Sequence, residues 1–83
     1  MGYNDMLTLE LIEMTQEKAI YGYHPEDKDE HGILSVNIHT GEVDVVKIAE
    51  SDRHKRYLSH AISKIAQLSH SGTYEKKVTV AWC

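Results

Sequence analysis

Six histidines among 83 residues are the first feature of this sequence that suggests chemistry, because neutral imidazole is the commonest protein ligand for transition metals. His24 and His31 bracket an acidic segment, residues 26–30, so this loop is the best candidate for a metal or small-molecule site. His54 and His60 lie six residues apart and do not match the i, i+4 spacing of a helical zinc site. A solvated acidic connection that binds nothing accounts for the same loop residues, and we favour it.

One run of basic residues, Arg53-His54-Lys55-Arg56, lies where we expect a helix to begin. Cations there oppose the positive end of the helix macrodipole, so their placement needs a reason. Ion pairs with nearby acidic residues are the simpler reason. The alternative is a contact between Arg53, Lys55 and Arg56 and an anion or a partner molecule, strengthened by Lys64 and Lys76-Lys77. A formal net charge of −4 argues against nucleic acid as that partner.

No catalytic motif is present: the sequence has no Gly-x-Ser-x-Gly, no glycine-rich phosphate loop and no spacing typical of a nucleophile with its base. We therefore predict no catalytic, cofactor-binding or metal-ligating residues and a protein that is not an enzyme. The single cysteine, Cys83, excludes an internal disulfide and favours a reducing compartment. With no basic leader and no apolar run of about 18 residues, we expect a soluble cytoplasmic protein that does not associate with membranes.

Length and composition predict one small folded domain, residues 1–83. Hydrophobic residues make up 41% and charged residues 27%, which is typical of globular chains and not of disordered ones. Alternating apolar and polar residues predict strands. The predicted strands cover residues 6–14, 18–24, 33–39, 43–48 and 74–82.

Two of these strands have an irregular pattern. In residues 6–14 the alternation slips by one position near Leu11 and Ile12, which predicts a β-bulge; a helix is the rival interpretation, but its apolar stripe would be poor. In residues 43–48, alternation places Val43 and Val45 on one face but Val46 and Ile48 on the other. This strand is therefore either bulged or covered on both sides.

The helix has the clearest signal in the sequence. Apolar residues recur at spacings of three and four from Leu58 to Leu68, and Gly72 is suited to end the helix. We expect the helix to start within Ala49–Asp52, with Ser51 or Asp52 as the N-cap.

The order of elements predicts an α+β domain: a mainly antiparallel five-stranded sheet, formed by a four-strand meander, a helix and a last strand, with the helix packed on one face. The last strand either pairs with the first at an edge or inserts between others. One helix covers only one face, so apolar residues on the other face imply either bulges or a second copy of the chain, a homodimer. The residues concerned are Ile12, Ile20, Val46 and Ile48.

Several short segments together resemble small uncharacterised proteins of Gram-positive bacteria. They are Tyr21-Gly22-Tyr23-His24-Pro25-Glu26, Thr40-Gly41-Glu42, Ala49-Glu50-Ser51-Asp52 and Ala81-Trp82, and the similarity spans residues 18–82. The resemblance implies a bacterial cytosolic origin and a compact α+β unit, and it implies no activity.

The function itself is not given by the sequence. The leading hypothesis is a non-enzymatic domain that binds another protein and self-associates. The alternatives are a small-molecule or metal-binding domain that uses the loop from His24 to His31, and a nucleic-acid accessory protein that uses the basic residues Arg53 to Arg56.

Overall fold

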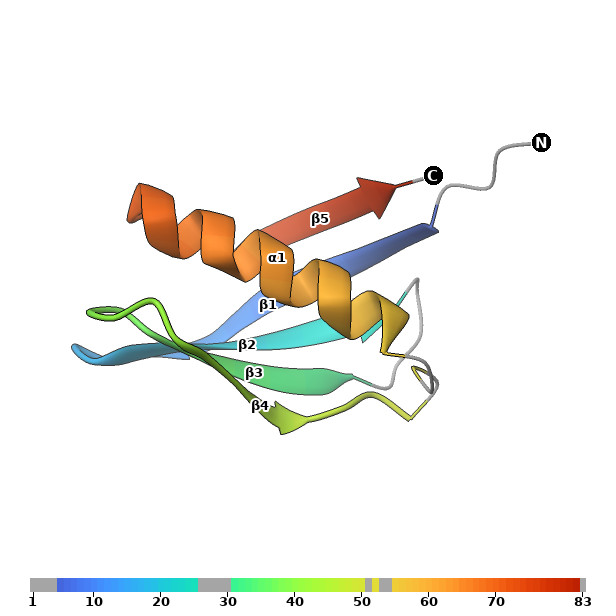
Figure 1. The fold of residues 1–83 in the computed structure, drawn as a ribbon, viewed down its shortest axis with the longest axis horizontal. Helices are drawn as coiled ribbons and strands as arrows, with labels where there is room; N and C mark the ends of the chain where they lie inside the picture. Colours follow the sequence, from blue (N-terminus) through green and yellow to red (C-terminus); the bar gives the residue numbers. More distant parts are fainter. Residues whose placement is uncertain (1–4, 26–30, 51, 53–54, 83) are drawn as a thin grey trace.

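The computed structural model describes residues 5–25, 31–50, 52 and 55–82 (Figure 1). Within them, the strands form one open antiparallel sheet in the order β4-β3-β2-β1-β5, and the helix lies across one face of it. The predicted α+β architecture is confirmed. The elements are β1 (Asp5–Met14), β2 (Lys18–Pro25), β3 (Gly32–Asn37), β4 (Val43–Lys47), α1 (Arg56–Ser71) and β5 (Lys77–Trp82).

The last strand settles the question of topology that the sequence left open. β5 pairs with β1 in a regular register from Asp5–Trp82 to Glu10–Lys77, so the first and last strands of the chain are neighbours. β5 is therefore one edge of the sheet, and β4 is the other. Both ends of the described chain lie at the same end of the sheet (Figure 1).

The core lies between α1 and the sheet face that α1 covers. Alternate residues of each strand are buried on this face, as period-two patterning requires. Tyr21 and Tyr23 are its largest side chains, and both are fully buried. The helix contributes Leu58, Ala61, Ile65 and Leu68, and the strands add Leu7, Leu9, Ala19, Leu34, Val36 and Val78. The predicted apolar stripe of the helix is thus confirmed.

Both predicted strand irregularities are β-bulges. The register between β1 and β2 shifts between Leu11 and Glu13, which leaves Ile12 as the extra residue. The register between β3 and β4 shifts as well, because Leu34 is opposite Val45 whereas Ile33 is opposite Lys47, so Val46 is extra. A bulge adds one residue to one strand and lets the alternation resume afterwards.

The expected start of the helix is wrong. The helix begins at Arg56, its N-cap is Lys55, and the Lys55 side chain makes no capping hydrogen bond. Lys55 adopts a left-handed backbone conformation with φ 57°. Capping comes instead from Asp52, whose carboxylate accepts hydrogen bonds from the backbone N–H groups of Tyr57 (3.1 Å) and Leu58 (2.8 Å). The sequence signal for a cap was correct, but the intervening turn separates the capping residue from the helix.

The predicted end of the helix is confirmed. Gly72 has φ 78°, a left-handed conformation that glycine adopts without steric cost, and its N–H donates to the carbonyls of Leu68 and Ser69.

Candidate functional site

The sheet face opposite α1, here called the outer face, carries a stripe of aliphatic side chains. Ile12 lies over Gly22, since a Cβ built on Gly22 would be 3.3 Å from Ile12 Cδ1. Gly22 pairs with Ile33 of β3, and Ile33 in turn pairs with Lys47, next to the bulged Val46. These neighbours form a row across four strands. We call Ile12, Ile20, Ile33 and Val46 the apolar stripe.

Exposure distinguishes this stripe from the core. Ile12 is 55% exposed and Val46 is 63% exposed, whereas Leu9 and Leu34 on the opposite face are fully buried. Ile20 and Ile33 are half-buried. No element among the described residues packs on the outer face, because α1 lies on the other side of the sheet.

Charged side chains of both signs surround the apolar stripe. Strand alternation and register place six exposed charged residues on the outer face. Three are acidic and three are basic, so their charges cancel. They are Glu10, Glu13, Asp44, Lys18, Lys47 and Lys77.

The two histidines of the alternative binding loop, His24 and His31, meet at one end of the outer face. The ring centroids of His24 and His31 are 5.1 Å apart, and the rings are inclined by 32°. His24 Nε2 also lies 3.4 Å from Glu10 Oε1. The acidic residues 26–30 that the sequence places between the two histidines lie outside the described residues.

Metal binding at these histidines finds no support in the described part of the chain. Among those residues, no group of three or more His, Cys, Asp or Glu side chains is arranged to hold a metal ion.

The predicted basic contact residues are only partly described. Lys55 and Arg56 are exposed at the start of α1, and Arg53 lies outside the described residues. The first-turn N–H groups of Tyr57 and Leu58, which an external anion would need, already donate to Asp52. An anion at the helix start would therefore find these two amides already engaged.

Asp52 belongs to a buried polar network beneath the helix start. Its side chain is only 3% exposed, and its Oδ2 accepts a hydrogen bond from the Tyr23 hydroxyl at 3.2 Å. The same hydroxyl accepts a hydrogen bond from the Ala49 N–H at 3.0 Å. Burial raises the pKa of the Tyr23 hydroxyl; the Ala49 hydrogen bond opposes this rise and the charge of Asp52 adds to it. These hydrogen bonds tie the buried Asp52 and Tyr23 to the start of the helix and hold it against the sheet.

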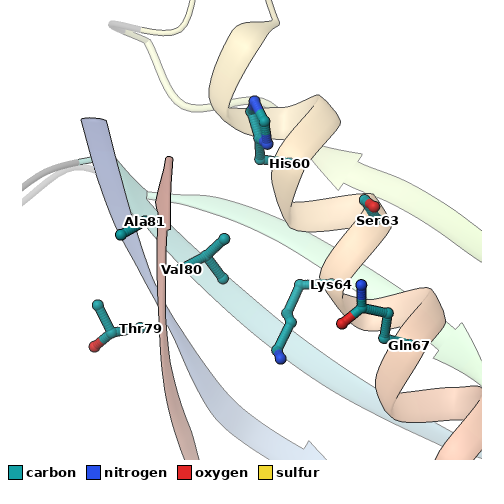
Figure 2. Close-up of a pocket in the computed structure, with 7 residues that line it drawn as sticks. All are labelled: His60, Ser63, Lys64, Gln67, Thr79, Val80 and Ala81. Carbon is teal, nitrogen blue, oxygen red and sulfur yellow. The ribbon is translucent and has the colours of Figure 1, made fainter. Parts of the chain in front are cut away.

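A polar groove of about 330 Å³ lies between α1 and the edge strand β5 (Figure 2). From the helix side, four residues at helical spacing line it, and Lys64 extends from the helix toward β5. Sequence reasoning named Lys64 and Lys77 as basic residues but did not predict the groove, because its two walls are about 16 residues apart in the chain. The lining residues are His60, Ser63, Lys64 and Gln67 of α1 and Thr79, Val80 and Ala81 of β5.

Comparisons with known proteins give no relative. No model of a known protein family matches the chain, and neither the curated proteins nor the solved structures include a match. Within the described residues, no helix has the length and apolarity needed to cross a membrane.

Proposed function

We propose that this chain is a non-enzymatic protein-interaction domain that forms a homodimer, with the outer faces of two copies in contact. The observation that carries the proposal is the apolar stripe: Ile12 and Val46 are more than half exposed on a sheet face that no described element covers. Removing such side chains from water is favourable by roughly 25 cal/mol per Å² of apolar surface.

The charges around the stripe favour a second copy as the occupant. Two strongly acidic or strongly basic faces would repel each other, but the outer face carries three acidic and three basic residues. A two-fold arrangement can bring the acidic residues of one copy near basic residues of the other. Packed sheets lie about 10 Å apart, a distance that interdigitated isoleucine and valine side chains fill.

The stripe is small, so we expect a weak dimer. Association costs about 4–15 kcal/mol in lost translational and rotational freedom, and a few aliphatic side chains offset little more than that. The dissociation constant should lie in the micromolar range, roughly −8 kcal/mol in binding free energy.

The proposal includes a bacterial cytoplasmic location. The single cysteine in the sequence suits a reducing compartment, and a bacterial origin is what the resemblance of segments such as Tyr21-Gly22-Tyr23 to small Gram-positive proteins implies.

Sedimentation velocity tests the dimer. From about 1 to about 200 µM, a range that brackets a micromolar dissociation constant, the wild-type chain should shift from monomer to dimer. Val46→Lys places two like charges at the contact and should weaken the dimer at least about tenfold, equal to 1.4 kcal/mol. Val45→Lys is the matched control, because Val45 is 44% exposed and pairs with Leu34 of the covered face. A wild-type chain that stays monomeric throughout, or equal effects of both substitutions, would refute the proposal.

A further inference from the structure

The open edge of β5 presents backbone groups that no described strand pairs with. The Leu11 N–H donates to the Lys76 carbonyl at 2.8 Å, one step beyond the Glu10–Lys77 pair. Antiparallel pairs alternate between hydrogen-bonded and non-hydrogen-bonded positions, so Val78 and Val80 also direct their backbone groups to β1. Lys77, Thr79 and Ala81 consequently direct their N–H and C=O groups away from β1, toward the edge.

The two edges of the sheet differ in how well they accept another strand. The bulge at Val46 interrupts β4, and a bulged edge is a poor template for pairing. β5 pairs with β1 over six consecutive residues without a register shift, so its free side is a regular template about 20 Å long.

The groove beside this edge is basic. Lys64 is half-buried in its wall, and no hydrogen bond or ion pair with another described residue satisfies its ammonium group. The described residues that line the groove include no acidic side chain. An ammonium group that has no counter-charge among the described lining residues favours an anionic ligand.

We propose that β5 binds an extended acidic segment of a partner protein, which adds to the sheet as a sixth strand and places carboxylates in the groove near Lys64. The backbone groups at Lys77, Thr79 and Ala81 supply the hydrogen bonds of this strand, and Lys64 supplies the preference for acidic residues. This site uses the sheet edge and the groove, so it does not rest on the outer-face dimer.

Charge also argues against a second copy at this edge. In an antiparallel pairing of two β5 strands, the two-fold axis would pass near Thr79 and Val80, which line the groove together with Lys64. The two Lys64 ammonium groups would then approach each other, and like charges across an interface are unfavourable. An acidic segment converts the same charge into an attraction.

Two synthetic peptides test this proposal by fluorescence anisotropy at low ionic strength. One is fluorescein-labelled Thr-Glu-Val-Glu-Val-Glu-Thr with a blocked C-terminus, and the other has lysine in place of each glutamate. The acidic peptide should bind at least about tenfold more tightly than the basic one. In amide NMR spectra of the labelled protein, it should shift and protect Lys77, Thr79 and Ala81. Equal binding of both peptides, or shifts confined to another surface, would overturn the proposal.

Two variants separate the charge from the strand edge. Lys64→Glu should reverse the preference between the two peptides, whereas the same charge change on the other edge, Lys47→Glu, should leave it unchanged.

Thr79→Pro removes an N–H that faces away from β1, so the fold should persist while the added strand loses a hydrogen bond. Unchanged affinity of a folded Thr79→Pro protein would contradict strand addition. Protection of the β5 amides that increases with protein concentration, without peptide, would instead indicate that a second copy binds there and would also contradict the proposal.

Discussion

Asp52 connects the sheet to the start of the helix through a single buried carboxylate. One oxygen accepts the Tyr57 N–H, and the other accepts the Leu58 N–H and the Tyr23 hydroxyl. Buried donors that lose their acceptor keep the cost of desolvation without compensation. The position of α1 over the sheet therefore depends on this side chain more than on Lys55 at the formal N-cap.

We predict that Asp52→Ala lowers the free energy of unfolding by about 3 kcal/mol, because three donors lose their acceptor. Asp52→Asn retains one acceptor oxygen and should cost less. Urea denaturation followed by circular dichroism measures both. Asp44→Ala, which removes an exposed carboxylate of β4, is the control and should change the free energy by less than about 0.5 kcal/mol. Equal effects at the two positions would show that Asp52 does not hold the helix.

Tyr21 makes stability depend on alkaline pH. Burial raises its pKa from 10.0 to about 12, with further contributions from Glu75 and Tyr74. The unfolded chain loses this proton near pH 10.0, while the folded chain keeps it to about pH 12. The resulting stability is complete below the lower value and is lost as the pH rises through the higher one.

Melting temperatures should therefore fall between about pH 10 and about pH 12. Absorbance at 295 nm should show a tyrosine that ionises late. Tyr21→Phe should flatten this pH dependence, although at neutral pH it costs about 1 kcal/mol through the lost hydrogen bond to the Glu75 carbonyl. The explanation fails if every tyrosine ionises near pH 10 while the protein is still folded.

At the scale of elements, sequence patterns predicted what depends on local alternation and missed what depends on loops. The slip at Ile12 and the face change at Val46 are visible in the sequence because a bulge displaces every later side chain of its strand. The helix start was placed too early because the sequence identifies Asp52 as a capping residue but does not encode the shape of the turn that follows.

The two candidate surfaces also differ in how far the sequence predicted them. Three residues of the apolar stripe, Ile12, Ile20 and Val46, were among the unmatched apolar residues that the sequence indicated, whereas Ile33 was not named. The groove was not predicted, because it requires that β5 be an edge strand beside α1, and the pattern allowed β5 two positions. Lys64 was recognised as basic, but only the fold reveals that it extends toward β5.

Gly32 allows β2, β3 and β4 to pack closely. A Cβ at this position would lie 2.6 Å from Tyr23 Cζ and 2.7 Å from the Lys47 carbonyl oxygen, a backbone atom. Gly32→Ala should therefore lower the free energy of unfolding by about 3 kcal/mol. Gly22→Ala is the matched control on β2: its Cβ would meet the end of the flexible Ile12 side chain at 3.3 Å, so the change should stay within about 0.5 kcal/mol. Chemical denaturation compares the two, and similar losses would exclude close packing as the cause.

At the scale of the whole molecule, α1 covers one face of the sheet and leaves the other exposed. If the exposed face binds a second copy, stability depends on association. A partner that binds only the folded state raises the melting temperature as its concentration rises, and for a homodimer the partner is the protein itself. We predict that the melting temperature increases by a few degrees between about 5 and about 500 µM. Differential scanning calorimetry measures this change, and Val46→Lys should abolish it. A melting temperature independent of concentration would argue against outer-face pairing.

Because Asp5 pairs with Trp82, the first and last strands of the chain end side by side. A short flexible linker from the residue before Asp5 to the residue after Trp82 would join adjacent strands as a new hairpin. The chain can then be opened in the exposed turn between β1 and β2, where Gln16 and Glu17 are exposed. Such a permuted protein retains each strand pair and begins at the present Glu17. We expect it to fold to the same sheet, as its amide NMR spectrum would show.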